Sequence, residues 1–381
     1  MSLTEVGSVE ESVIHNGDQY FDELCLALSK AKKSIHLETY IFNRDKLGQQ
    51  LLTLLVRAAA RGVRVQLLMD GVGSSQWTFK EAEKIRALGV HIHFFHPLPW
   101  QKKNRSIWRF WRLRKLTLEL FKLNHRNHRK LCLIDDETLF AGSFNVMDQD
   151  LPRMIGDQAW RETGVRLKGT HIEPFIELTR EAWQFSRSYY HRQDSKPHFL
   201  YFFGSNGILE SRRERNYYYH ELLDRIRRVK NHIWITSAYF VPDRRLIRYL
   251  KKAAERGVDV RLLFPHKSDF AGVKFAMEGL YHSLLKSNIK IYEYLPSMLH
   301  AKILCFDDWV SIGSANLDHR SLFQDLEANV ILAQEGNILA VHEQFLKDLS
   351  VSREVDLDEW KDRSFLQKWL ELFFLLFRRL L

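Results

Sequence analysis

The sequence has little cysteine, no Pro/Gly-rich stretch and no signal-peptide pattern. Its three cysteines, Cys25, Cys132 and Cys305, form no CxxC pair and are odd in number. A disulfide framework or a zinc cluster is therefore not expected, and a reducing compartment is favoured. The lack of low-complexity segments argues against a disordered arm. Residues 1–13 have neither a basic flank nor an apolar run, so no signal peptide is expected there.

Length and composition indicate a folded protein of two domains with a basic surface. The chain has 381 residues, which is too long for one ordinary core and fits two domains of roughly 150–200 residues. Its apolar and charged fractions, 45% and 27%, are those of a folded protein. The formal charge of +10 predicts attraction to nucleic acid, an anionic bilayer surface or a phosphorylated ligand. Charge alone does not choose among these.

The two halves of the chain repeat one pattern. Residues 55–70 and 250–265 share a helical periodicity, a glycine at Gly62 or Gly257, and an apolar strand. A further strand-like run precedes each segment, at 35–42 and 233–242. Each half is therefore predicted to be a βαβ unit whose helix ends at the glycine. The expected fold class is α/β, with a parallel or mixed sheet flanked by helices in each half.

Each half also carries a His-x-Lys motif at the start of an apolar run. The first copy contains His128, Lys130, Asp135, Ser143 and Asn145. The second copy contains His300, Lys302, Asp307, Ser314 and Asn316. Residues two apart on a strand project to the same face, so each histidine and its lysine can point together. Such residues suit a phosphate: one histidine attacks phosphorus, the other protonates the departing alkoxide, and lysines and asparagines hold the nonbridging oxygens.

The motif aspartates are a separate case. Asp135 and Asp307 each lie five positions beyond the lysine, on the opposite strand face or in the following turn. An aspartate in a turn commonly accepts hydrogen bonds from backbone N–H groups. The residues themselves therefore favour a structural role for this pair.

An insertion distinguishes the first half from the second. Asp70 and His128 are 58 positions apart, whereas the equivalent Pro265 and His300 are 35 apart, so the first half has about 23 additional residues. This segment, about 100–123, is rich in Arg and Lys interleaved with aromatics, among them Trp108, Arg109, Trp111 and Arg112. It suits the interface of an anionic membrane. Single-stranded nucleic acid, or a solvated basic helix packed by its aromatics, are the alternatives.

The C-terminal residues 364–381 predict an amphipathic helix with a wide apolar face. That face includes Trp369, Phe373, Phe374 and Phe377. Gln367, Lys368, Glu371 and Arg378 form a narrow polar stripe. A helix of this length spans ~27 Å, less than the ~30 Å hydrocarbon core, so it is not expected to cross a membrane. Lying in the membrane interface is favoured over docking on the lobes, since docking would need a large apolar groove.

The paired HxKxxxxD and GSxN motifs resemble those of the phospholipase D superfamily, over nearly the whole chain. Within it the chain resembles bacterial cardiolipin synthases, through LETYIF, NHRK and WRETGVRLKG in the first half and YFVPD, LHAK and GSANLDHRS in the second. The resemblance implies two similar α/β/α lobes related by a pseudo-twofold axis, with one active site at their interface. The lobes would span 1–195 and 196–360, followed by a C-terminal helix, 361–381.

The resemblance also assigns residues. His128 and His300 would be the catalytic pair, with His128 as nucleophile, acting through a covalent phosphatidyl-histidine without a metal or other cofactor. The motif groups Lys130, Lys302, Asp135 and Asp307 with them. Ser143, Asn145, Ser314 and Asn316 would bind the substrate phosphate. Glu162 and Glu327 stand where family members place an acidic residue that orients a histidine, which fixes the tautomer by accepting the Nδ1 proton.

The implied function is phosphatidyl transfer from phosphatidylglycerol to the hydroxyl of a second phosphatidylglycerol, giving cardiolipin and glycerol. The expected partner is an anionic phospholipid membrane, at the cytoplasmic face of a bacterial inner membrane, with no nucleic acid. One alternative is a hydrolase or nuclease of the same superfamily, because the basic surplus suits nucleic-acid phosphates equally well. Another is a non-enzymatic membrane-shaping protein, but such a protein would be free to lose catalytic groups, and both His-x-Lys pairs are intact.

Overall fold

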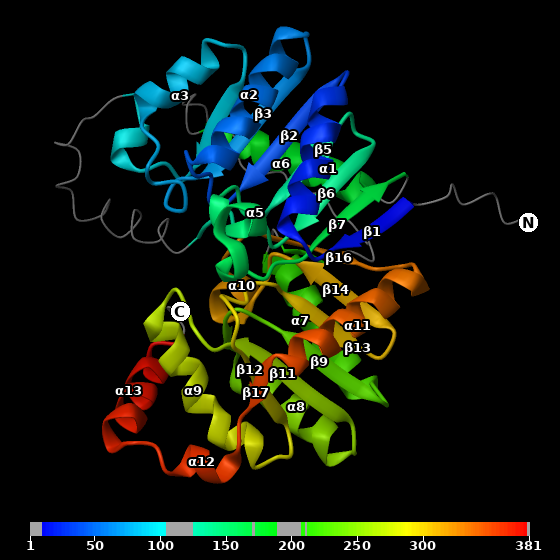
Figure 1. Cartoon of the computed structure of the whole chain (residues 1–381), viewed down its shortest axis with the longest axis vertical. Helices are drawn as coiled ribbons and strands as arrows, with labels where there is room; N and C mark the ends of the chain where they lie inside the picture. The colour runs from blue at the N-terminus through cyan, green and yellow to red at the C-terminus, as the bar shows by residue number, and fades with distance from the viewer. Residues whose placement is uncertain (1–9, 104–124, 170–171, 189–206, 210–211, 379–381) are drawn as a thin grey trace, which may run out of the picture.

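The computed structural model describes residues 10–103, 125–169, 172–188, 207–209 and 212–378, which form two stacked lobes (Figure 1). Each lobe contains one mixed sheet. The first sheet has the order β1(Glu10–Ile14)-β7(Gly164–Lys168)-β6(Thr138–Gly142)-β5(Leu131–Ile134)-β2(Ser34–Thr39)-β3(Arg64–Asp70)-β4(His91–Phe95). The second has the order β8(Gly207–Leu209)-β16(Glu327–Ile331)-β14(Trp309–Gly313)-β13(Ile303–Phe306)-β9(His232–Thr236)-β11(Asp259–Pro265)-β12(Lys290–Tyr294)-β17(Ser352–Glu354).

The two sheets repeat one topology. In each, three strands run parallel and a fourth, β5 or β13, pairs antiparallel with the first of them. Strand β17 extends the second sheet beyond β12. The α/β class, the mixed sheets and the two similar lobes predicted from the duplication are confirmed. The proposed lobe boundary at 195/196 lies outside the described residues.

Helices flank both sheets, and local sequence determines where they begin and end. They are α1(Gly17–Lys30), α2(Lys46–Ala60), α3(Phe79–Arg86), α5(Pro152–Ile155), α6(Glu173–Ser188), α7(Arg212–Arg228), α8(Arg244–Glu255), α9(Ala271–Leu285), α10(His319–Phe323), α11(Glu335–Ser350), α12(Leu357–Lys361) and α13(Phe365–Leu376). The equivalent helices α2 and α8 are capped at their N-termini by Asp45 and Asp243. Each carboxylate accepts the backbone N–H of the residue three positions later. Both are followed by a glycine with φ +87°, Gly62 or Gly257, as predicted.

A shared apolar core joins the lobes. It combines residues of β5, β6 and β7 with residues of β13, β14 and β16. Figure 1 shows these strands meeting at the middle of the molecule. Cys305 belongs to this core, and all three cysteines are unpaired. Burial of one continuous core fixes the lobes against each other, so side chains at the ends of these strands can face one another across the interface.

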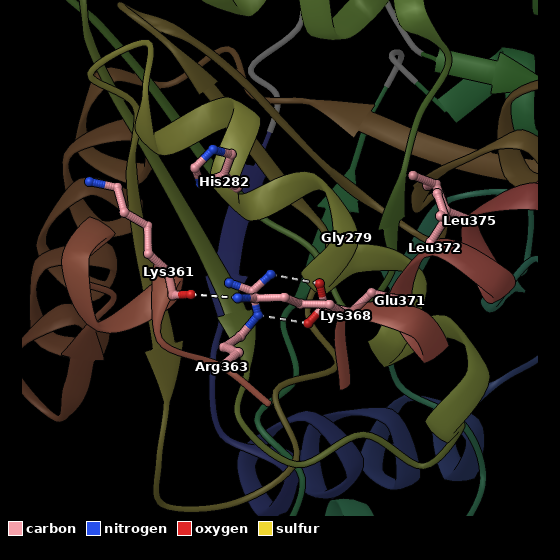
Figure 2. A pocket seen from close by; sticks show the side chains of 8 residues that line it. All are labelled: Gly279, His282, Lys361, Arg363, Lys368, Glu371, Leu372 and Leu375. Carbon is pink, nitrogen blue, oxygen red and sulfur yellow. Dashed lines mark hydrogen bonds and ion pairs between the residues drawn. The ribbon is translucent and has the colours of Figure 1, made fainter. Parts of the chain in front are cut away.

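The C-terminal helix α13 packs against α9 in an unusual orientation (Figures 1 and 2). Phe374 stacks on Phe275 with ring centroids 5.7 Å apart, and Glu371 is buried in a bidentate ion pair with Arg363. Glu371 of the polar stripe therefore faces the protein, whereas Lys368 is exposed, and most of the apolar face is exposed as well. No helix among the residues described has both the length and the apolarity to cross a membrane.

Candidate active site

The two His-x-Lys motifs lie at the lobe interface, each just before the strand that its lobe contributes to the shared core. His128 and Lys130 precede β5, and His300 and Lys302 precede β13. Each lysine ammonium donates to the carbonyl oxygen of its own histidine, at 2.8 Å for Lys130. Every histidine and its lysine are thus on one side of the extended chain, as the two-residue spacing predicts.

Reciprocal backbone hydrogen bonds hold the motifs together across the interface. The His128 N–H donates to the Leu326 carbonyl at 3.0 Å, and the His300 N–H donates to the Arg161 carbonyl at 3.0 Å. Each acceptor is the residue just before Glu327 or Glu162. The same hydrogen bond occurs once in each direction because the lobes are related by a pseudo-twofold axis. They position each histidine beside the glutamate of the other lobe.

Each histidine is bound by the carboxylate of the opposite lobe. His128 Nδ1 lies 3.0 Å from Glu327, and His300 Nδ1 lies 2.5 Å from Glu162. Both glutamates are fully buried. A carboxylate at Nδ1 fixes the ring as the Nδ1–H tautomer and leaves Nε2 for chemistry. The two glutamates therefore stand where the resemblance places histidine-orienting acids, but each acts on the other lobe's histidine.

The two histidine–glutamate pairs differ in how the protein shifts the pKa values of their members. Burial lowers the pKa of His128 well below its usual value, and the charges of Lys130 and Lys302 add to the effect. Burial also lowers the pKa of His300, but the Glu162 carboxylate opposes this. Burial raises the pKa of Glu327 to about 7. At Glu162 burial acts in the same sense, yet His300 and other neighbours lower its pKa overall.

The lysines form a site for an anion. Burial and, after it, the charge of Lys302 lower the pKa of Lys130 to about 7. Burial lowers the pKa of Lys302 to about 8, against the opposing charges of Glu162 and Glu327. Two ammonium groups that repel each other in a buried place are stabilised by a negative charge between them. A phosphodiester supplies that charge at its nonbridging oxygens.

Serines and asparagines of the GSxN turns have different positions. The Ser314 hydroxyl donates to Glu327 at 2.5 Å, and Ser143 exchanges hydrogen bonds with the backbone of Thr163, next to Glu162. The serines thus support the glutamates, and their assignment as phosphate ligands stays a prediction. The Asn145 and Asn316 side-chain oxygens accept the N–H groups of Ile41 and Tyr239. Because the oxygens are used in this way, the amide nitrogens are the groups left for a substrate oxygen.

Asp135 and Asp307 lie at the far ends of β5 and β13. Asp135 accepts the backbone N–H groups of residues 32–34, and Asp307 those of residues 230–232, all within 3.1 Å. Each lies five positions along the chain from its lysine, about 16 Å in an extended strand. Grouping them with the catalytic residues was wrong, because they fix the β2 and β9 strand starts. The structural role that the turn position predicts is confirmed.

We expect Asp307→Ala to lower the free energy of unfolding by about 1–3 kcal/mol, because three backbone donors lose a charged acceptor. Denaturant titration measures this. Asp308→Ala, at the exposed neighbouring position, is the matched control. Activity per folded molecule should be retained in both. Loss of turnover at unchanged stability would contradict the structural assignment.

Several site residues were missed by sequence reasoning. The Tyr40 ring lies edge-on to His128 at 5.0 Å, and Trp160 lies 5.1 Å from His300. A buried ion pair, Arg126–Asp70 at 2.7 Å, anchors the segment that leads into His128. Asp150 is buried beside Glu162. Alignment of the two halves would have shown Asp150, because it stands eight residues after Gly142, where the second half has Ser321 after Gly313.

The predicted membrane-binding residues are only partly visible. Trp108, Arg109, Trp111 and Arg112 lie outside the described residues. Trp369 and Phe373 on α13, and Phe377 directly after it, are exposed. Phe374 was wrongly included in the outward face. It turns inward because Gly272 on α9 leaves room for its ring: a Cβ at residue 272 would come within 2.9 Å of it.

Comparison with known proteins agrees with this geometry. A family model described as "Cardiolipin synthase, PLD-like domain" matches residues 24–176 and 222–349. The chain belongs to this family. The cardiolipin synthase 2 of Staphylococcus epidermidis is 32% identical over 94% of this chain and 72% of its own, and the cardiolipin synthase of Clostridium perfringens is 30% identical over 93% and 73%. As a cardiolipin synthase family member, the protein is an enzyme of the phosphatidyltransferase type.

Solved structures agree on the fold. A phosphatidylserine synthase of Haemophilus influenzae matches 97% of this chain and 95% of its own, with a TM-score of 0.69 at 13% identity. A polyphosphate kinase of Porphyromonas gingivalis matches 92% of this chain and 49% of its own, with a TM-score of 0.60 at 15% identity. At such identities these matches show the shared fold alone.

Proposed function

We propose that this cardiolipin synthase family member transfers a phosphatidyl group from phosphatidylglycerol to the hydroxyl of a second phosphatidylglycerol, through a covalent phosphatidyl-histidine. The observation that supports this proposal most strongly is the pairing of each histidine with the glutamate of the other lobe. It holds both Nδ1 atoms as donors and presents two Nε2 atoms, from different lobes, to one phosphate. Nucleophilic attack and protonation of the leaving group need such a pair.

The charge distribution supports His128 as the nucleophile and His300 as the acid. A nucleophilic imidazole must be neutral, and burial with two lysines favours neutral His128. The ionised partner, Glu162, stabilises an imidazolium at His300. In the first step His128 Nε2 bonds to phosphorus, the P–O bond to glycerol breaks, and the His300 proton goes to the glycerol oxygen.

The second step reverses these roles. Neutral His300 accepts the proton of the incoming hydroxyl, its oxygen bonds to phosphorus, and the bond to His128 breaks. Lys130, Lys302 and the amide nitrogens of Asn145 and Asn316 stabilise the nonbridging oxygens throughout. If water takes the place of the lipid hydroxyl, the product is phosphatidic acid, so the identity of the acceptor decides between transferase and hydrolase.

The test of this function is incubation of purified protein with labelled phosphatidylglycerol vesicles, followed by lipid analysis. Formation of cardiolipin and an equal amount of glycerol is expected. Phosphatidic acid as the main product would indicate a phospholipase. Cleavage of single-stranded DNA, in the absence of lipid turnover, would indicate a nuclease.

A covalent intermediate should be trapped on one histidine. Enzyme mixed with substrate labelled at phosphorus and denatured in alkaline detergent should retain label that is stable to base and labile to acid, as a phosphoramidate is. Transfer should follow ping-pong kinetics, because one phosphate site serves both half-reactions in turn. His300→Ala should still accumulate label, but slowly, because it keeps the nucleophile and lacks only the acid that protonates the departing glycerol. Labelling of His128→Ala would overturn the nucleophile assignment.

Activity should be indifferent to EDTA. Lysines and imidazolium supply the positive charge that a metal ion supplies in other phosphoryl-transfer sites. The measurement is cardiolipin formation before and after dialysis against chelator. Loss of activity that a divalent ion restores would contradict the proposal.

We place the exposed face of α13 in the interface of an anionic membrane. Its most exposed residues, Phe365, Leu366, Leu372 and Leu376, are 61–84% exposed, and water-facing apolar rows of this extent mark interaction surfaces. Beside the helix a cavity of about 370 Å³ is lined by basic residues, among them His282, Arg363 and Lys368 (Figure 2). An apolar row next to cationic groups fits acyl chains and anionic headgroups. The insertion at 100–123 is proposed to add Coulomb attraction.

A further inference from the structure

The two halves of the site differ at one buried position. In the second lobe, Glu327 accepts hydrogen bonds from Ser314 at 2.5 Å and from Ser321 at 2.7 Å. In the first lobe, Asp150 occupies the position that corresponds to Ser321. A hydroxyl that donates to one glutamate is thus replaced by a second carboxyl group beside the other.

Two oxygens of this carboxyl pair have no hydrogen-bond partner in the structure. Asp150 Oδ2 accepts the Asn145 N–H at 2.9 Å, and Glu162 Oε1 binds His300, but Asp150 Oδ1 and Glu162 Oε2 are buried and unpaired. The Ser143 hydroxyl also lies near Glu162, but its hydrogen is directed to the Thr163 carbonyl at 3.1 Å. Two unpaired buried acceptors with full negative charge would be costly.

We infer that Asp150 is protonated and donates its hydrogen from Oδ1 to Glu162 Oε2, so that the two carboxyl groups share one proton and one negative charge. One hydrogen atom then satisfies both unpaired oxygens, and Asp150 does for Glu162 what Ser321 does for Glu327. The pKa values agree: burial and then the charge of Glu162 raise that of Asp150 well above its usual value. The other charges that face Asp150 are Lys302 and Lys130, and the neutral Tyr20 hydroxyl also lies near.

Asp150 is therefore a positioning residue for His300, acting through Glu162. A donor at Oε2 withdraws charge from the carboxylate and so limits how strongly it raises the pKa of His300. Through the Asn145 N–H, the same side chain also fixes the turn that carries a proposed phosphate ligand. The catalytic consequence rests on the proposed function, whereas the protonation state does not.

The decisive measurement is the titration of His300 by NMR in the resting enzyme, which needs no substrate. Asp150→Ala removes the donor and leaves Glu162 a stronger base, so the pKa of His300 should rise by about one unit, a tenfold change in proton affinity. Asp150→Asn keeps an N–H donor to Glu162 and an oxygen for Asn145, so it should restore the value of the wild type. If Asp150 is instead ionised, both variants remove a negative charge and the pKa of His300 should fall in both, which would overturn the inference.

Two further readouts separate this result from a structural effect. One C=O band of a protonated carboxyl should be lost from the infrared spectrum when Asp150 is replaced by asparagine; a difference spectrum without such a loss would overturn the inference. Ser321→Ala, the matched change in the other lobe, should shift the titration of His128 and leave that of His300 unchanged. Transfer activity should fall about tenfold in Asp150→Ala and be rescued by Asp150→Asn and Asp150→Ser. If the titrations behave as expected and cardiolipin is not formed, the proposed reaction fails and the shared proton stands.

Discussion

Replacing either His128 or His300 with alanine should reduce phosphatidyl transfer by about three orders of magnitude or more, because nucleophile and acid act as one unit. The two side chains belong to different lobes, and each is bound by a different glutamate, so neither can take over the role of the other. Cardiolipin formation under saturating phosphatidylglycerol is the measurement. His220→Ala, at an exposed position on α7, is the matched control. Either variant keeping more than about a tenth of the activity would rule out the single shared site.

A substrate with an activated leaving group separates the two roles. In a phosphatidyl ester of a nitrophenol, the leaving group is a nitrophenolate, which departs without a proton. His300→Ala should therefore regain most of the first half-reaction, whereas His128→Ala should not. The crossed pairing extends the test: Glu162→Gln should respond like His300→Ala, and Glu327→Gln like His128→Ala. If each glutamate instead served the histidine of its own lobe, Glu162→Gln would respond like His128→Ala, and Glu327→Gln like His300→Ala.

Replacing the outward row of α13, Phe365, Leu366, Leu372 and Leu376, with glutamine should release the enzyme from anionic vesicles. These side chains are exposed, so the fold and the turnover of a short-chain soluble substrate should be unaffected. If each contributes about 1–2 kcal/mol on entering the interface, vesicle affinity should fall about a thousandfold or more. Vesicle sedimentation measures the affinity, and thermal unfolding checks the fold.

The matched control changes four exposed leucines elsewhere, Leu26, Leu88, Leu339 and Leu346, to glutamine. This control should bind vesicles like the wild type. Equal vesicle binding by the α13 variant would show that the row does not contact the membrane. Deletion of residues 364–381 is a less specific test, because it also removes the Phe374 contact with Phe275 and the Glu371–Arg363 pair. An unfolded deletion would show that those inward contacts belong to the core.

Local patterns were sufficient for much of the fold. The glycines after α2 and α8 and the strand–helix–strand order could be predicted, because helix termination and strand alternation depend on residues close in sequence. The His-x-Lys motifs could be identified for the same reason, and Asp135 and Asp307 could be assigned to turns. The orientation of α13 could not, because the burial of Glu371 depends on Arg363, eight residues away, and on the surface of α9.

The sequence by itself determined that this protein has two similar α/β lobes and two copies of a phosphate-handling motif, since both follow from repeated short patterns. Only the tertiary structure decided which glutamate serves which histidine. His128 and Glu327 are 199 positions apart, and His300 and Glu162 are 138 apart. Both pairs form across a pseudo-twofold interface, and spacing along the chain does not reveal which lobe a side chain faces. The same packing buries Asp150 beside Glu162, where one proton shared between two carboxyl groups lowers the cost of burying them.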